Sequence, residues 1–114
     1  MKVINGRKDG WIGEHVIYIG RANPRLKLKA SPLANPFRIG KDGDRATVIS
    51  KYRQWLDQKI EEGDRTVLDE LEEIRERVEN GDRIQLACYC APRACHGDVI
   101  CDRIIESLRS TRNS

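Results

Sequence analysis

Apolar residues recur along the chain at two different spacings, which predict a mixture of strands and helices. Three short runs rich in β-branched and aromatic residues, at 3–5, 15–19 and 83–88, are typical of strands. The run at 15–19 is apolar at successive positions, as in a strand that is buried on both faces. We therefore expect this run to be the central strand of a sheet.

Three longer segments repeat their apolar residues every three or four positions and are expected to be helices, at 44–60, 64–79 and 94–109. The first two begin with an aspartate, Asp44 or Asp64, which can accept hydrogen bonds from the free N–H groups of the first turn. A strand, two helices, a second strand and a last helix form the order of an α/β unit with parallel strands.

The 114 residues are expected to form one domain, 1–114, in which 110–114 is a frayed tail. The composition, 39% hydrophobic and 34% charged, is that of an ordinary water-soluble protein. No apolar run approaches the roughly 18 residues that cross a membrane, and the first residues lack the apolar segment of a signal peptide. We therefore expect a cytoplasmic protein with reduced thiols and no membrane partner.

Charge is distributed unevenly along the chain. Residues 1–56 carry twelve Lys and Arg against four Asp and Glu, whereas residues 57–82 carry four against eleven. A basic N-terminal half suits an anionic partner, either a phosphate-bearing ligand or nucleic acid. A solvated surface that is merely uneven in charge is the alternative.

Residues 20–43 contain the turn residues of an ordered binding loop, although the alternation of Leu26 and Leu28 would also fit a short strand. An amide, a ring and three cations follow one another in this region: Asn35, Pro36 and Phe37, then Arg38, Lys41 and Arg45. An aromatic ring beside cations suits a base and its phosphates. Phe37 would equally serve to anchor the loop to the core.

Residues 86–101 hold all four cysteines, a clustering unlike a disulfide framework. A zinc site would use Cys88, Cys90, Cys95 and His96, although their spacing differs from that of most structural zinc sites. An enzyme would use Cys95, whose thiol pKa falls at a helix N-terminus, as nucleophile, with His96 or Asp98 as acid or base. Plain packing in the core is the simplest role for Cys101.

Ligands of open α/β sheets bind beyond the carboxyl ends of the strands, against helix N-termini. Loops 20–45 and 88–98 both begin at that edge, so we expect them to face one another across a cleft. The N–H groups of residues 95–98 would bind an anion, unless Asp98 caps them itself. The predicted ligand-binding residues are Asn5, Arg7, Gly20, Arg21, Asn35, Pro36, Phe37, Lys41, Asp44, Arg45, Cys88, Cys90, Pro92, Cys95, His96, Gly97 and Asp98.

Three parts of the chain resemble a known family: residues 16–21 (VIYIGR), residues 33–45 (LANPFRIGKDGDR) leading into 52–55 (YRQW), and residues 86–98 (LACYCAPRACHGD). On these residues the chain resembles the domain-of-unknown-function family 4326, which is common in phages and bacteria. Ala34 and Tyr89 stand where Gly and Trp are usual. The last part is also similar to a second uncharacterised family, numbered 488, and both families are similar to the SLOG nucleotide-sensing group.

The resemblance implies a small Rossmann-like, SLOG-like three-layer α/β fold with a short, mostly parallel sheet and about three helices. It also implies binding or processing of nucleotides and ADP-ribose derivatives. A phage-borne member would act in the host cytoplasm, where it would sequester a nucleotide signal made by host defence.

The leading hypothesis is a module that binds a nucleotide-derived small molecule similar to ADP-ribose. Its phosphates would be held by Arg21, Lys41 and Arg45, and its base or ribose by Asn35 and Phe37.

Two alternatives remain. The first is an enzyme that cleaves a glycosidic or phosphate bond of a nucleotide in the same cleft. The second, less favoured, is nucleic-acid binding through Arg25, Lys27 and Lys29. The sequence leaves homo-oligomer formation open and indicates no cofactor other than the zinc alternative.

Overall fold

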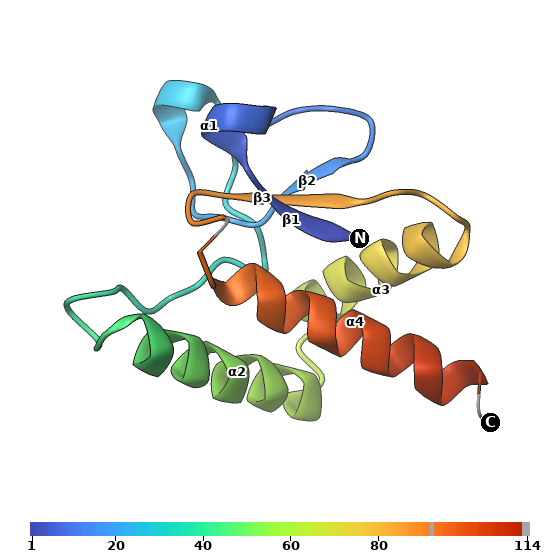
Figure 1. Cartoon of the computed structure of the whole chain (residues 1–114). Coiled ribbons are helices and arrows are strands. Elements are labelled where there is room, and N and C mark those ends of the chain that lie inside the picture. The colour runs from blue at the N-terminus through green and yellow to red at the C-terminus, as the bar shows by residue number, and fades with distance from the viewer. Residues whose placement is uncertain (92, 113–114) are drawn as a thin grey trace.

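Three short parallel strands form the sheet in the computed structural model, which describes residues 1–91 and 93–112 (Figure 1). They are β1 (Lys2–Asn5), β2 (Val16–Tyr18) and β3 (Gln85–Cys88), in the order β1-β3-β2. Both outer strands pair with β3 in parallel, so that Val3 and Ile17 flank Leu86. The carboxyl ends of all three strands therefore meet at one edge of the sheet.

The expectation that residues 15–19 form the central strand was wrong, because β3 occupies that position. Residues 86–88 of β3 are all buried, whereas β2 is half-buried. Even so, β2 is apolar on both faces, because Ile17 packs against the core and the ring of Tyr18 contacts Trp11. Two apolar faces therefore make this edge strand look like a central strand in sequence.

Three long helices follow the predicted periodicity: α2 (Arg45–Glu62), α3 (Arg65–Glu79) and α4 (His96–Arg112). The carboxylate of Asp44 accepts a hydrogen bond from the backbone N–H of Thr47 at 2.8 Å. That of Asp64 accepts one from Val67 at 3.2 Å. These bonds satisfy N–H groups that the first turn of a helix leaves free, and they confirm the predicted caps.

The structure departs from the expected boundaries in three places. The turn-rich stretch after the first strand begins with a short helix, α1 (Gly6–Asp9). A 3₁₀ helix, η1 (Pro24–Leu26), and a single bridge between Asn23 and Leu28 replace the possible short strand. Helix α4 continues through Arg112, past the predicted end of the helix and into the segment expected to fray, while residues 113–114 lie outside the described part.

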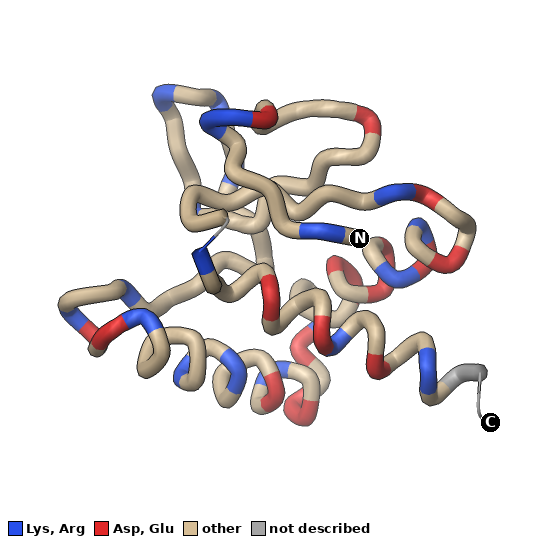
Figure 2. Tube along the Cα trace, viewed as in Figure 1, with Lys and Arg blue, Asp and Glu red and all other residues tan. Residues whose placement is uncertain are grey.

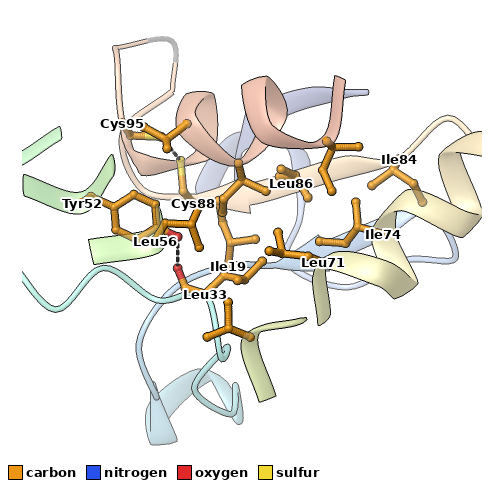
Figure 3. Close-up of a cluster of buried hydrophobic side chains, with 14 of the residues drawn as sticks. Ile19, Leu33, Tyr52, Leu56, Leu71, Ile74, Ile84, Leu86, Cys88 and Cys95 are labelled. Carbon is orange, nitrogen blue, oxygen red and sulfur yellow. Dashed lines mark hydrogen bonds between the residues drawn. The ribbon is translucent and has the colours of Figure 1, made fainter. Parts of the chain in front are cut away.

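The long helices lie together on one side of the sheet, and α1 and η1 lie on the other (Figure 1). Side chains of the sheet and the long helices meet in the core, as Figure 3 shows for Ile19, Ile74 and Leu86. The hydroxyl of buried Tyr52 donates to the carbonyl oxygen of Leu33 at 2.7 Å, which ties loop 20–45 to α2. The fold is thus the small α/β, Rossmann-like arrangement that the resemblance implied. Within the described residues, none of the helices is long and apolar enough to span a bilayer.

Candidate ligand-binding site

A pocket of about 350 Å³ lies beyond the carboxyl ends of β2 and β3. This volume is in the range of small-molecule sites in proteins. The pocket is formed by loop 20–45, by loop 88–98, which we call the cysteine loop, and by the first turns of α2, so the two loops face one another as expected. Its lining residues are Gly20, Arg21, Asn35, Phe37, Arg38, Ile39, Arg45, Val48, Ile49, Cys88, Tyr89, Cys90, Ala94, Cys95 and His96.

Arg21 holds the wall of the pocket that contains Phe37. Its Nε donates to the carbonyl oxygen of Asn35 at 3.0 Å, and its Nη2 donates to that of Phe37 at 2.8 Å. The side-chain oxygen of Asn35 accepts a hydrogen bond from the backbone N–H of Phe37 at 2.9 Å, a local turn typical of asparagine. Two of the residues predicted to touch the ligand therefore also shape the loop.

Arg45 bridges the two loops. Its Nη1 donates to the carbonyl oxygen of Ala94 at 2.9 Å, so the first residue of α2 holds the end of the cysteine loop. Arg38 lines the same pocket and is exposed to solvent. Among residues 1–91 and 93–112, the arginines of the pocket (Arg21, Arg38 and Arg45) form no ion pair with a carboxylate. Their charge is therefore left available for an anion.

Two thiols meet at the base of the pocket. The Sγ atoms of Cys88, at the end of β3, and Cys95, just before α4, lie 3.3 Å apart (Figure 3). The hydrogen bond from Cys95 and the backbone N–H groups of Cys90 and Ala91 together lower the pKa of Cys88 to about 6. The same hydrogen bond and burial raise the pKa of Cys95. Cys88 is therefore the more acidic of the two thiols and ionises first as the pH rises.

This pair reverses one expectation from the sequence. A cysteine at a helix N-terminus was expected to have a lowered pKa, but the pKa of Cys95 is raised. The reason is that the two sulfurs share one hydrogen bond, so ionising Cys95 in addition to Cys88 would place two thiolates in contact. If one of the two sulfurs is a nucleophile in the reduced protein, it is Cys88.

His96 is buried and lines the inner wall of the pocket. Its side chain is packed edge-on against the ring of Tyr52, and its Nε2 lies 2.7 Å from the carbonyl oxygen of Ile19. Because a carbonyl can only accept, Nε2 carries the proton of the neutral ring. Burial lowers the pKa of His96, so the ring is neutral at pH 7. His96 therefore fixes the end of β2 to the start of α4.

The expected anion site at the start of α4 is largely filled by the chain itself. The carboxylate of Asp98 accepts a hydrogen bond from the backbone N–H of Cys95 at 3.0 Å. The Sγ of Cys95 accepts one from Gly97 at 3.3 Å. These bonds cap the helix in the manner of a capping box, so the alternative role for Asp98, a helix cap, is the one observed. Gly97 faces Val3, where a Cβ would lie 2.9 Å from a methyl carbon, so its small size serves packing.

Several predicted residues lie outside the pocket: Asn5, Arg7, Pro36, Lys41, Asp44, Gly97 and Asp98. Asn5 instead donates to the carbonyl oxygen of Ala91 at 3.1 Å and so supports the cysteine loop from below. Arg7 stacks over the ring of Tyr89, 5.7 Å from its centre. Pro92 lies outside the described residues.

Other pocket residues are absent from the predicted set: Arg38, Ile39, Val48, Ile49, Tyr89 and Ala94. Arg38 directly follows the Asn-Pro-Phe turn and is one of the three cations noted in that region of the sequence. Val48 and Ile49 lie in the first turns of α2. Whether these turns border the pocket depends on the direction of the preceding loop, which the sequence does not show.

The geometry of the described residues does not support the zinc site considered from the sequence. Across residues 1–91 and 93–112, no group of three or more His, Cys, Asp or Glu side chains is arranged to hold a metal ion.

A family model described as Domain of unknown function (DUF4326) matches residues 3–106. The chain belongs to this family. The match spans both loops of the pocket, which agrees with the motifs noted in the sequence. Neither a curated protein nor a solved structure matches the chain.

Proposed function

We propose that the protein binds an anionic, nucleotide-derived small molecule similar to ADP-ribose in the pocket beyond β2 and β3. The observation that carries this proposal is the set of pocket arginines, which surround one hollow without carboxylate partners in the described chain. A guanidinium group presents several N–H donors in a plane, which matches the geometry of a phosphate.

The rest of the pocket suits a base or a ribose. The rings of Phe37 and Tyr89 line it, and a flat base can stack on such rings. The apolar side chains of Val48 and Ile49 border it on the side of α2. A site with apolar walls and a few cations is typical of a small-molecule pocket.

Isothermal titration with ADP-ribose, ADP, AMP and a cyclic dinucleotide tests the proposal. Arg38→Ala and Arg45→Ala should each weaken binding about tenfold to a hundredfold, because a hydrogen bond to a charged group contributes roughly 1.5–3 kcal/mol. Arg65→Ala is the matched control, since Arg65 lies on α3 and pairs with Asp69 at 3.1 Å. Absence of heat with all four compounds would overturn the proposal.

An enzyme acting on the same ligand is the second candidate, and the Cys88 thiolate at the base of the pocket favours it. A thiolate can attack a glycosidic carbon and form a covalent intermediate. Chromatography of ADP-ribose after incubation distinguishes the two candidates. Unchanged ligand supports binding alone, which is what sequestration of a nucleotide signal requires, whereas products that disappear with Cys88→Ser support catalysis.

Nucleic-acid binding stays a weaker prediction. Arg25, Lys27 and Lys29 are exposed around η1 and do not line the pocket. Binding through them would weaken steeply as salt is raised.

A further inference from the structure

Cys88 and Cys95 bring two sulfur atoms together at the ends of two rigid elements. The residues are seven positions apart, and their Sγ atoms are separated by 3.3 Å (Figure 3). A disulfide bond is about 2.05 Å long, so small side-chain rotations close the remaining gap. β3 and α4 therefore hold a dithiol ready to form a bond.

The two sulfurs also differ in reactivity. Thiolates react with peroxides, whereas protonated thiols do not. Cys88 is the ionised partner, with a pKa lowered to about 6 by the Cys95 hydrogen bond and two backbone N–H groups. Cys95 keeps its proton and lies next to it. A thiolate beside a second thiol is the arrangement found in redox-sensing cysteines.

Small solutes can reach this pair through the pocket. Both cysteines line it, although they are only 2% and 4% exposed. Hydrogen peroxide is close to water in size, so a pocket of this volume admits it. Cys101, on α4, does not line the pocket, and burial raises its pKa to about 11. It therefore stays protonated and serves as an internal reference.

We propose that Cys88 and Cys95 form an oxidative modification site, at which one molecule of hydrogen peroxide converts the two thiols into a reversible intramolecular disulfide. The Cys88 thiolate attacks one peroxide oxygen, the O–O bond breaks, and hydroxide leaves and is protonated to water. Cys88 is then a sulfenic acid. The Cys95 sulfur attacks the Cys88 sulfur, the S–O bond breaks, and the hydroxyl leaves with the Cys95 proton as a second water. Two thiols are oxidised, and the peroxide is reduced to two waters.

Oxidation changes the charge of the pocket. In the reduced protein the Cys88 thiolate places a negative charge at the base of a site surrounded by arginines. The disulfide is neutral, so it removes repulsion against an anionic ligand. This effect on ligand binding rests on the proposed function, whereas disulfide formation does not.

The site is tested on the full-length reduced chain with a small excess of hydrogen peroxide. The protein is then unfolded in urea, the free thiols are alkylated, and the peptides are mapped by mass spectrometry. We expect a disulfide joining Cys88 to Cys95, alkylated Cys90 and Cys101, and recovery of all four thiols with dithiothreitol. No disulfide, or a disulfide joining a different pair, would overturn the proposal.

Single substitutions separate the two chemical steps. Cys95→Ser should stop at a Cys88 sulfenic acid that dimedone traps, and Cys88→Ser should give neither product. Cys101→Ser is the matched control and should behave as the unsubstituted chain. Because a buried substitution can impair folding, phenylarsine oxide provides a measurement on the unsubstituted protein. It bridges neighbouring thiols and should protect Cys88 and Cys95, but not Cys101, from alkylation after the protein is unfolded in urea.

Titration of reduced and oxidised protein with ADP-ribose measures the link to the ligand. A lower dissociation constant after oxidation is expected. Disulfide formation in a protein that binds no ADP-ribose supports the modification site and contradicts the proposed function. Binding of ADP-ribose without disulfide formation contradicts only the modification site.

Discussion

The arginines of the pocket and those of the helical side are in opposite electrostatic situations. Arg53, Arg65 and Arg103 pair with Asp102, Asp69 and Asp57, and Arg75 and Arg77 also have carboxylate partners. In the described chain the arginines of the pocket have none, although Arg21 and Arg45 bond to carbonyl oxygens. Figure 2 shows acidic residues along α3, along α4 and at the end of α2, with a few more near α1 and the start of α2.

The cysteines repeat this contrast. Cys88, at the pocket, has a pKa lowered to about 6, whereas burial raises that of Cys101 on α4 to about 11. Exposed ion pairs contribute little to stability, roughly 0–1 kcal/mol, so the paired arginines are not what holds the fold together. The difference teaches that the pocket arginines are set apart from these paired arginines by their lack of a carboxylate partner among the described residues, and not by the amount of charge.

Reversing the charge at the pocket should have the largest effect. The double variant Arg38→Glu with Arg45→Glu should lower affinity for ADP-ribose by more than about a hundredfold, because it replaces attraction of phosphates by repulsion. Isothermal titration measures the loss. The double variant Arg53→Glu with Arg65→Glu changes the net charge equally on the helical side, and an equal loss in that variant would show that net charge, not the pocket, controls binding.

Removing the Arg21 side chain should affect both stability and binding. Arg21→Ala removes two hydrogen bonds that hold the carbonyl groups of Asn35 and Phe37, and we expect a loss of about 2 kcal/mol in the free energy of unfolding. Urea denaturation measures it. Unchanged stability together with lost binding would mean that Arg21 acts on the ligand alone.

A smaller effect, from the ionisation of Cys88, should appear only when the pH is varied. Because the pKa of Cys88 is lowered in the folded state, its contribution to stability is present above the pKa of an unfolded cysteine and is lost as the pH falls toward 6. Iodoacetamide should alkylate Cys88 with a midpoint near pH 6, and Cys101 should stay unreactive to about pH 11. Equal midpoints for the two cysteines, read from peptide masses, would remove the contrast between the two regions.

The smallest effect is expected on the helical side. Arg65→Ala breaks an exposed ion pair with Asp69, which lies four positions further along α3. The free energy of unfolding should fall by less than about 1 kcal/mol, with no change in ADP-ribose affinity. Thermal unfolding and titration measure both. A larger loss of stability would show that these ion pairs are structural.

Part of the site was predictable, because parallel strands end at the same edge of a sheet. That rule placed loops 20–45 and 88–98 opposite one another and brought Arg45 and His96 to one pocket. It could not reveal that Arg21 would be bonded to two carbonyl groups, and it left open whether Asp98 would cap the start of α4 by accepting from the backbone of Cys95. Hydrogen-bond partners depend on atomic positions that residue spacing does not contain.

The sequence alone determined the long helices, the aspartate caps and the uneven charge, since helical periodicity and capping act between residues a few positions apart. Only the tertiary structure decided that β3 is central, that the pocket arginines lack carboxylate partners among the described residues, and that Cys88 rather than Cys95 has the lowered pKa. The physical reason is that strand order, ion pairing and the pKa of a buried thiol depend on groups that are distant in sequence and meet only in the folded chain.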